Sequence, residues 1–558
     1  MTALSQTEDY APKGNRRGQR SGTGVFSFLA WAVALSCILP MVAVALAAVT
    51  GGTETIQHLA DTVLSRYALT TFGLVTLVSL GTLAIGVGAA WLVTMTRFPG
   101  VRLFEIVLVL PLAFPAYVLA YAYTFILDHP GIVQTSLRQV TGWGPRDYWF
   151  PEIRSLGGAA VMLVLVLYPY VYLLARAAFL QQSGGAFLAA RALGKNAFQA
   201  FWLVSLPMAR PAIASGVLLA VMETIADFGT VSYFGVQTFA TGIYTSWFSM
   251  GDRAGAAQLA LCLLIFALML AVVERSTRGK ARYHQAGKQH ASMPPADLKG
   301  WRAFGAWVLC ALPVCFGFVL PVIILFNMGL QSEQDLLSRR YIAFLQNSLT
   351  LATLAALLTV LAAICLGFYQ RLRPGRRSAA AAYMSRLGYA VPGGVIAVGL
   401  MVPFAAFDNA LDAWMRANFE IRTGLLISGS IWLLIGAYMV RFLAAALGAY
   451  ESGQSTVHAN MDSAARSLGQ GPLGMLRRVH LPMLTPSLLT ALLIVFVDVM
   501  KELPATLIMR PFNYDTLAVQ AYRLASDERL EGAAVPSLVI VAVGLLPVIL
   551  ICRQVGRR

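Results

Sequence analysis

The sequence predicts an all-α polytopic membrane protein of about twelve transmembrane helices, arranged as two tandem six-helix halves. Hydrophobic residues make up 58% of the 558-residue chain and charged residues only 12%, whereas soluble domains are about 25% charged. Apolar runs of about 20 residues, the length that crosses a bilayer, recur along the whole chain. A segment of the first half also returns in the second half at constant spacing.

This composition excludes several other classes of protein. A chain so apolar is neither disordered nor collagen-like. Its net charge of +16 is explained by basic residues that flank membrane spans, so nucleic-acid binding is not expected. Its six cysteines lie in apolar runs without CxxC or Cys/His spacing, so they predict neither a disulfide framework nor a metal site.

Twelve apolar segments are the candidate membrane helices, with bounds defined to within a few residues. In the first half they are roughly 26–49, 71–95, 104–127, 157–180, 212–235 and 256–274. In the second half they are roughly 303–328, 346–370, 380–406, 424–447, 487–509 and 534–552. The first segment is too long for a signal peptide and is followed by no small-residue cleavage site, so it is expected to span.

The distribution of basic residues predicts the orientation of these spans. Basic residues gather at both chain ends, in the linker between the halves and in the RLRPGRR loop. Because basic loops remain in the cytoplasm, both termini are expected there. The polar N-terminal segment is expected to be disordered. The predicted boundaries are a cytoplasmic tail (1–24), a first half (25–274), a cytoplasmic linker (275–302), a second half (303–552) and a short tail (553–558).

The internal repeat is the most specific feature of the sequence. Residues 189–213 read AARALGKNAFQAFWLVSLPMARPAI and residues 464–488 read AARSLGQGPLGMLRRVHLPMLTPSL, with an offset of 275 and identity at ten of 25 positions. Each copy lies between the fourth and fifth spans of its half, on the cytoplasmic side. Because six is even, the halves run parallel, which predicts a pseudo-two-fold axis along the membrane normal and a pathway between the halves.

The repeated loops, placed at 181–212 and 448–486, have the composition of short helices that turn sharply. Their paired alanines leave a flat helix face, their glycines suit a helix C-terminus, and their LP prolines suit the return toward the membrane. We therefore predict a paired docking surface for a partner protein. Its residues are Ala189, Ala190, Arg191, Gly194, Ala464, Ala465, Arg466 and Gly469.

These loops resemble the EAA loop of the permease subunits of binding-protein-dependent, type I ABC importers. The resemblance implies the type I permease fold and a coupling helix in each loop, seated on an ABC ATPase subunit present in two copies. The glutamate of the family pattern is replaced by Leu188 and Ser463, with Asp462 beside the second. The chain contains no GxxxxGK(S/T) phosphate loop. It is therefore expected to be a transporter subunit and no enzyme, without cofactors of its own, while the partner binds ATP and Mg²⁺.

Acidic residues occupy matching places in the fifth and eleventh spans. Glu223 and Asp227 correspond at the same offset to Asp498 and Glu502, and Lys501 occurs only in the second copy. The i, i+4 spacing predicts each acidic pair on one helix face. Charges inside a membrane are costly and commonly functional, so one interpretation is a substrate path for hard cations, which prefer oxygen ligands. The other is structural: the acids pair with Lys501, polar neighbours or backbone and only hold helices together. No metal ligand is assigned with certainty.

Other polar and helix-breaking residues carry weaker predictions. Arg386 and Arg441 lie in or near spans and are expected to snorkel toward water or headgroups. The third spans of the two halves contain PLAFPAY (111–117) and YAVPGGV (389–395). Broken helices at corresponding positions are typical of substrate paths, although a simple packing kink explains the same residues.

Two further stretches narrow the resemblance. ETIADFGTVSYFGVQTFATGIYTSWFSMGD (223–252) and FVDVMKELPATLIMRPFNYDTLAVQAYRLASDERL (496–530) look like the two half-signatures of fused ferric-iron uptake permeases. The resemblance implies transfer of Fe³⁺ from a periplasmic iron-binding protein to the cytoplasm by alternating access, across a bacterial inner membrane. Relatives of this architecture carry thiamine, polyamines, phosphate or sulfate, and these remain alternatives. A secondary cation transporter is the alternative class, but it would not need paired docking loops.

Overall fold

The computed structural model describes residues 16–182, 184–277, 296–332, 334 and 338–555 of the chain. Over these residues helices joined by loops predominate, and the β-structure is one two-residue parallel ladder, in which Thr96 and Arg97 pair with Ala296 and Asp297. In this described part of the chain, eleven helices are long and apolar enough to cross a membrane, and one pair bent by 91° brings the number of spans to as many as twelve. The predicted all-α polytopic fold is therefore confirmed.

The two halves share a repeated order of membrane helices but differ in their short elements, among which 3-10 and π turns are labelled η. The first half comprises α1 (Arg16–Thr50), α2 (Thr53–Leu59), η1 (Ala60–Leu64), α3 (Ser65–Met95), β1 (Thr96–Arg97), α4 (Val101–Val107), η2 (Leu110–Ala113), α5 (Ala116–Leu127), α6 (Ile132–Thr141), α7 (Leu156–Gln181), α8 (Gly184–Ala192), α9 (Ala197–Ala200), η3 (Phe201–Ser205), α10 (Leu206–Ala226), α11 (Gly229–Tyr233), α12 (Phe239–Tyr244), η4 (Thr245–Ser249) and α13 (Arg253–Thr277). The second comprises β2 (Ala296–Asp297), α14 (Trp301–Val314), η5 (Cys315–Val319), α15 (Leu320–Gln331), α16 (Arg339–Leu372), α17 (Arg376–Leu387), η6 (Gly388–Ala390), α18 (Gly393–Phe419), α19 (Ile431–Gln454), α20 (Ala459–Ser467), α21 (Pro472–Met475), η7 (Leu476–His480), α22 (Leu481–Met500), α23 (Pro504–Met509), α24 (Leu517–Ser526) and α25 (Leu530–Val555).

The offset of 275 found in the sequence is preserved in the structure. The bounds of α8, α9 and η3 become those of α20, α21 and η7 when 275 is added to each residue number. Helices α10 and α22 begin at equivalent leucines, and α7 and α19 begin at equivalent positions. The duplication therefore covers the loops and helices around the predicted docking surface as well as the motif itself.

The first helices of the two halves are exchanged. α1 packs against α16, α17 and α18 of the second half, while α14 packs against α3 and α4 of the first and α15 against α5. Tyr123 of α5 donates a hydrogen bond of 2.6 Å to the carbonyl of Phe316 in η5. Because each half buries the first helix of the other, neither half completes its apolar surface alone.

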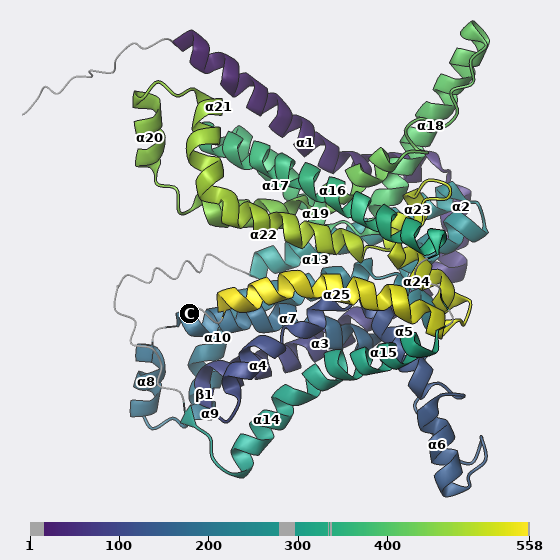
Figure 1. Cartoon of the computed structure of the whole chain (residues 1–558), viewed down its shortest axis with the longest axis vertical. Helices are drawn as coiled ribbons and strands as arrows, with labels where there is room; N and C mark the ends of the chain where they lie inside the picture. The colour runs from purple at the N-terminus through teal and green to yellow at the C-terminus, as the bar shows by residue number, and fades with distance from the viewer. Residues whose placement is uncertain (1–15, 183, 278–295, 333, 335–337, 556–558) are drawn as a thin grey trace, which may run out of the picture.

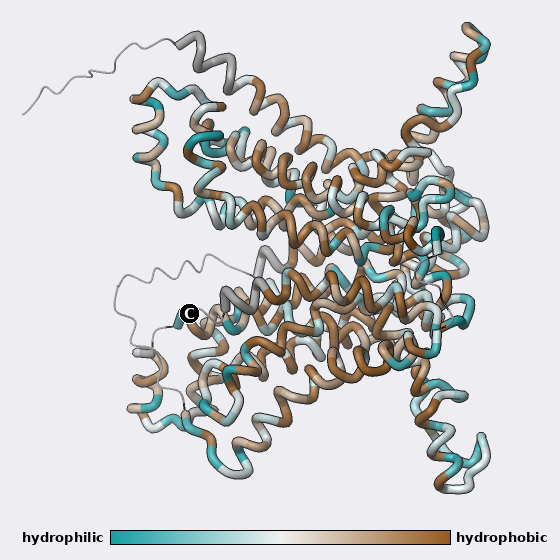
Figure 2. The backbone as a smooth tube through the Cα atoms, in the orientation of Figure 1, coloured by the Kyte–Doolittle hydropathy of each residue, from teal (hydrophilic) through white to brown (hydrophobic). Residues whose placement is uncertain are grey.

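Hydropathy divides the molecule into three zones (Figure 2). A central body of apolar helices lies between two polar ends, as expected where hydrocarbon contacts the middle of the helices. At one end lie α8 and α20, together with the described ends of the chain at α1 and α25 (Figure 1). At the other end α6 and the last turns of α18 project from the body (Figure 1).

Several predicted boundaries differ from the structure. The fifth and eleventh spans end early, at Ala226 and Met500, and continue as separate short helices. The predicted tail 1–24 is helical from Arg16 onward, because α1 runs beyond its apolar stretch. Of the predicted tails and linker, residues 1–15, 278–295 and 556–558 lie outside the described residues.

Candidate functional site: the coupling helices and the central cavity

Helices α8 and α20 carry the residues of the predicted docking surface and stand off the helical body on the same side (Figure 1). Gly194 and Gly469 follow these helices with φ angles of 80° and 76°. In both copies the glycine N–H bonds the carbonyl three residues back and the next N–H bonds the carbonyl five residues back. This is the glycine-ended helix terminus that the sequence predicts, because an L side chain is strained at these φ values.

Side chains on the two helices have similar exposure. Ala189 and Ala464 are exposed, and so are Arg191 and Arg466. The next alanines are more covered: Ala190 is half-buried and Ala465 is buried against the body. A Cβ placed on either terminal glycine would meet nothing within 4 Å. Each helix therefore exposes an alanine and an arginine, followed by an exposed leucine and a glycine with open space beside it.

Helix α20, the predicted coupling helix of the second half, is held against the helical body by polar side chains. Oδ2 of Asp462 on α20 lies 2.7 Å from Nε of Arg371 at the end of α16, and Oδ1 lies 2.9 Å from Nε2 of His480. Arg371 also donates to the carbonyl of Val457, at 2.8 Å. Asp462 is buried although it lies one residue from the glutamate position of the motif. It therefore holds the helix in place and is not presented to a partner.

The first coupling helix is fastened by aromatic side chains instead. Phe187 on α8, which occupies the position equivalent to Asp462, packs 6.2 Å from the ring of Trp91 on α3. Trp91 also contacts Phe179, at 5.8 Å, and Phe201, at 4.3 Å, between ring centroids. The two docking helices therefore occupy equivalent positions but are held by different interactions.

The second acid of each predicted pair, Asp227 in the first half and Glu502 in the second, caps the short helix that follows the break in its span. Asp227 accepts hydrogen bonds from the Thr230 and Val231 amides, both at 3.1 Å, and from the Thr230 hydroxyl at 3.0 Å. Glu502 likewise accepts from the Ala505 and Thr506 amides at 2.9 and 3.1 Å and from the Thr506 hydroxyl at 2.7 Å. The prediction that each i, i+4 pair shares one helix face is thus wrong, because the helix ends between its two acids.

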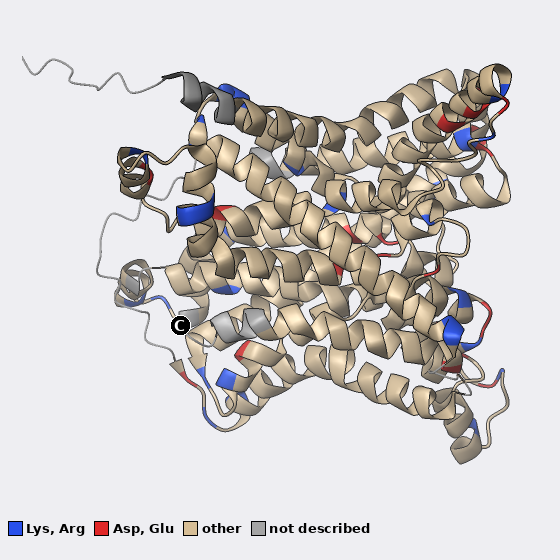
Figure 3. Cartoon of the chain, turned by 45° about the horizontal axis from the view of Figure 1, so that its top comes forward, with Lys and Arg blue, Asp and Glu red and all other residues tan. Residues whose placement is uncertain are grey.

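A cavity of about 110 Å³ lies where the broken helices of the two halves meet. Its walls come from α5, α7 and α10 of the first half and from α19 and α22 of the second. The charged residues that line it are Glu223, Asp227, Arg441, Asp498, Lys501 and Glu502. Four carboxylates face two cations, which leaves two carboxylates in excess. Acidic and basic segments are visible inside the otherwise uncharged body (Figure 3).

Besides Asp227, which is also partly exposed, the partly exposed carboxylates of this cavity are Glu223 and Asp498. Their side chains are 34% and 27% exposed, whereas that of Glu502 is 2% exposed. Nζ of Lys501 lies 2.9 Å from Oδ1 of Asp498. No group of three or more His, Cys, Asp or Glu within the described ranges is arranged to hold a metal ion. In this conformation the acids line a cavity and are not arranged as a preformed metal cage.

Arg441 does not snorkel toward water or headgroups, contrary to the prediction from the sequence. Its side chain is only 12% exposed and lies in the cavity wall, with Nη2 3.9 Å from Glu223 and Nη1 3.8 Å from Glu502. It does not snorkel because it lies near the middle of α19, where both acids are closer than water at either end. Arg386 is half-exposed and pairs with Glu451 at 2.5 Å, as expected for a residue near the surface.

The helix breaks predicted from the third spans are present. Pro115 lies at the 91° bend between the segments Val101–Ala113 and Ala116–Thr141. Val391 and Pro392 separate α17 and η6 from α18, which begins at Gly393. Tyr117 lines the cavity and its hydroxyl lies 3.4 Å from the carbonyl of Lys501. Both breaks therefore lie beside the charged residues, which favours the path interpretation over a simple kink.

On the side opposite to the coupling helices, an ion-pair cluster joins the halves. Arg154 contacts Asp128 of its own half at 3.0 Å and Glu528 of the other half at 2.8 and 3.0 Å. Its hydrogen bonds to Glu528 raise the pKa of Arg154. Ser232 and Tyr522 form a further contact between the halves at 3.0 Å. The halves are therefore joined on this side by polar contacts, which a motion that separated the halves here would break.

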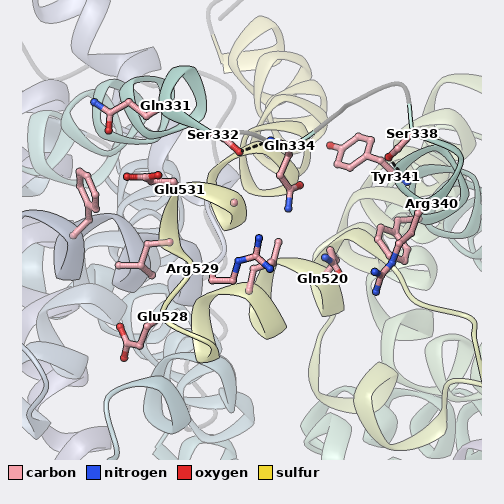
Figure 4. Close-up of a pocket in the computed structure, with 15 residues that line it drawn as sticks. Gln331, Ser332, Gln334, Ser338, Arg340, Tyr341, Gln520, Glu528, Arg529 and Glu531 are labelled. Atoms are coloured by element: carbon pink, nitrogen blue, oxygen red, sulfur yellow. Dashed lines mark hydrogen bonds between the residues drawn. The ribbon is translucent and has the colours of Figure 1, made fainter.

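A larger hollow of about 780 Å³ lies on the same side, between the ends of α15, α16, α24 and α25 (Figure 4). Arg340 and Arg529 face it, together with Glu528, Glu531 and several glutamines. The hollow is separate from the central cavity and lies mainly in the second half. Its size and mixed charge suit a polar loop of another protein better than a small ion.

Comparison with known protein families identifies the family of transport proteins that contains this chain. The family of inner membrane components of binding-protein-dependent transport systems matches residues 82–279 and 355–558. The two matches cover more than half of the chain and each contains one coupling helix and one pair of acids. The chain belongs to this family. Membership implies partnership with an ATPase and a periplasmic binding protein, and it confirms the resemblance seen in the EAA-like loops.

Individual relatives of this transport family differ in how much of the chain they match. The Fe(3+)-transport system permease protein FbpB 2 of Haemophilus influenzae is 26% identical over 93% of this chain and 96% of its own length. The ferric transport system permease protein FbpB of Actinobacillus pleuropneumoniae is 25% identical over 79% of this chain and 64% of its own. The molybdenum transport system permease protein ModB of Escherichia coli is 28% identical over 34% of this chain.

Proposed function

We propose that this chain is the transmembrane permease subunit of an ATP-driven importer that passes ferric iron from a periplasmic binding protein to the cytoplasm by alternating access. The observation that carries the proposal is full-length similarity, over both halves, to a permease named for Fe(3+) transport. The matches to the molybdenum and 2-aminoethylphosphonate permeases cover 34% and 22% of this chain. An acid-lined cavity also suits a cation better than these anionic cargoes.

The coupling helices are the proposed seats of the ATPase, one subunit on α8 and one on α20. Their exposed alanines and terminal glycines allow close approach of a partner surface. ATP and Mg²⁺ belong to that partner, so this chain works as a transporter subunit without a cofactor of its own. Because the described chain ends lie on the same side as these helices, both termini are assigned to the cytoplasm (Figure 1).

The opposite face is then periplasmic, and the binding protein is proposed to release its cargo there. The cargo would pass the Arg154 cluster and enter the cavity between the halves. Glu223 and Asp498 offer it accessible carboxylate oxygens from symmetric positions. A trivalent cation is strongly unfavourable at this depth without compensating charge, and these acids supply it.

The proposal is tested by removing the charge of Glu223 and Asp498 without changing their size. Glu223→Gln with Asp498→Asn should abolish ⁵⁵Fe³⁺ uptake by proteoliposomes that hold the complete complex with its binding protein. Assembly with the ATPase and the melting temperature should stay unchanged, because the coupling helices are untouched. Gly194→Trp with Gly469→Trp is the matched comparison, since it should lose the ATPase while leaving the cavity intact.

Each outcome decides a separate part of the proposal. Full uptake by the doubly neutralised variant would rule out the acidic path. Loss of uptake together with a large fall in melting temperature would return these acids to a structural role. Normal ATPase assembly in the tryptophan variant would remove α8 and α20 as the docking surface. Failure of the wild-type complex to transport iron, with transport of another cargo, would keep the architecture and change the substrate.

A further inference from the structure

Charges in the central cavity do not follow the symmetry of the fold. The acids are duplicated, since Glu223 and Asp227 recur as Asp498 and Glu502. The cations are not. Lys501 corresponds to Ala226, and Arg441 on α19 corresponds to Val166 on α7, which lines the same cavity. Because both halves keep the acids, the single-sided cations need a separate explanation.

Lys501 has an ion-pair partner close to it in the sequence, whereas Arg441 lies between acids from both halves. Lys501 contacts Asp498 of its own helix region at 2.9 Å. The guanidinium of Arg441 instead lies between one acid of each half, at 3.9 Å from Glu223 and 3.8 Å from Glu502. Its Nη1 atom is buried and has no hydrogen-bond partner. Charge-assisted hydrogen bonds are typically about 2.7–2.9 Å long, so this cation neutralises both acids without being fixed to either.

The surrounding backbone leaves room for this arrangement. A Cβ on Gly393, the first residue of α18, would collide with Nη1 of Arg441 and lie 2.8 Å from Oε1 of Glu502. A second, small pocket next to Tyr389 and Pro392 is also lined by Arg441 and Glu223. Arg441 and Glu223 therefore border both pockets.

We propose that Arg441 is a resident cation of the cargo path, which occupies the acids while no cargo is bound. In the described conformation it neutralises Glu223 and Glu502 together. Because these acids belong to different halves, any motion that separates the halves at this level withdraws Arg441 from one of them and frees a carboxylate for cargo. When the halves return, the arginine competes for that carboxylate and expels the cargo. The inference rests on the proposed cation path. It assigns the release of cargo from the carboxylates to the side chain of Arg441.

The test measures cation binding directly and does not depend on iron transport. Terbium(III) is a hard trivalent ion whose luminescence is sensitised by nearby tyrosines, and Tyr117 and Tyr170 line the cavity. It is titrated into the purified full-length permease–ATPase complex without nucleotide. Arg441→Gln should bind terbium about ten-fold more tightly than wild type, because the competing charge is removed. Arg441→Lys, which retains the charge, should stay within about three-fold of wild type.

Matched variants separate this role from general effects of charge. Arg386→Gln removes an arginine paired with Glu451 outside the cavity and should leave terbium affinity unchanged. Adding Glu223→Gln to Arg441→Gln should return the affinity to the wild-type range, since the freed acid is then missing. Arg441→Met, an apolar side chain of similar length, repeats the measurement if the glutamine variant does not fold.

Two results would overturn the inference. The first is a terbium affinity equal to that of wild type in the Arg441→Gln variant, provided that this variant keeps the wild-type melting temperature. If it does not, the same result in Arg441→Met would overturn the inference. The other is tight binding that persists after Glu223→Gln is added, because the ion would then lie elsewhere. If instead the arginine variants behave as expected but the wild-type complex does not carry iron, the resident cation stands and only the proposed cargo is wrong.

Discussion

Each broken span contains two acidic residues about one turn apart, and their side chains have different surroundings. Asp227 and Glu502 satisfy amide groups at the start of the short helices α11 and α23, which the membrane interior cannot hydrate. Glu223 and Asp498, one turn earlier, face the cavity and keep part of their surface open. Capping needs an acceptor oxygen, whereas attracting a cation needs a charge. Substitutions that separate these two properties can therefore assign each acid.

At Asp227 the acceptor is expected to matter more than the charge. Asp227→Asn keeps an oxygen for the Thr230 and Val231 amides, so the melting temperature of the purified protein should change little. Asp227→Ala removes the cap and should cost about 0.5–2 kcal/mol of stability. Thermal unfolding in detergent measures both variants, with ⁵⁵Fe³⁺ uptake alongside. If the asparagine variant were stable but transported nothing, Asp227 would belong to the cation path with Glu223.

The two coupling helices, α8 and α20, occupy equivalent positions in the two halves but are held against the body by different interactions. α20 is held by Asp462 between Arg371 and His480, and α8 by Phe187 against Trp91. Ion pairs need fixed geometry, while aromatic contacts tolerate small displacements. The second docking site is therefore expected to be the more rigid of the two. It should also be more sensitive to loss of a single side chain.

Truncation of these equivalent residues tests the difference. Asp462→Ala removes the acceptor of the buried His480 and one of the two acceptors of the partly exposed Arg371, and it should cost about 1–3 kcal/mol in the attachment of α20. Co-purification of the ATPase with this variant should fall, and iron uptake with it. Phe187→Ala is the matched variant in the first half, and its effect on assembly should be smaller. An equal or larger loss in Phe187→Ala would contradict the proposed ranking.

For the whole molecule, polar contacts between the halves lie around the cavity and on the side away from the coupling helices, whereas α1 packs along α16, α17 and α18 of the other half. Arg154 connects Asp128 of its own half to Glu528 of the other, and Ser232 meets Tyr522 nearby. These contacts must break if the passage is to open on that side. They are partly exposed and individually weak, so they can be released by a modest gain in contacts when a binding protein docks.

Weakening this outer cluster should favour the outward-open state. Arg154→Gln removes ion pairs worth about 0.2–1 kcal/mol each, so ATP hydrolysis without binding protein should rise by about two- to five-fold. ATPase activity of the reconstituted complex measures the change. Arg386→Gln, which removes an ion pair within the second half, provides the control and should leave the rate unchanged. A basal rate in Arg154→Gln no higher than wild type would show that this cluster does not restrain opening.

The sequence by itself determined the duplicated architecture of this protein. Span number follows from apolar length, because the thickness of the bilayer fixes how many residues cross it. The offset of 275 located both coupling helices, and glycine at 194 and 469 placed their ends, since the required backbone conformation is one that only glycine adopts readily. These features depend on local sequence and on solvent, so they needed no knowledge of neighbouring helices.

Only the tertiary structure decided what the intramembrane charges do. Periodicity placed Glu223 and Asp227 on one helix face, but the helix ends at Ala226 and gives the two acids different roles. Arg441 looked like a snorkelling residue until the packing of the halves brought it between Glu223 and Glu502. The role of Arg441 depends on partners that are distant in the chain, Glu502 in its own half and Glu223 in the other. The spacing of residues in the sequence therefore cannot reveal it.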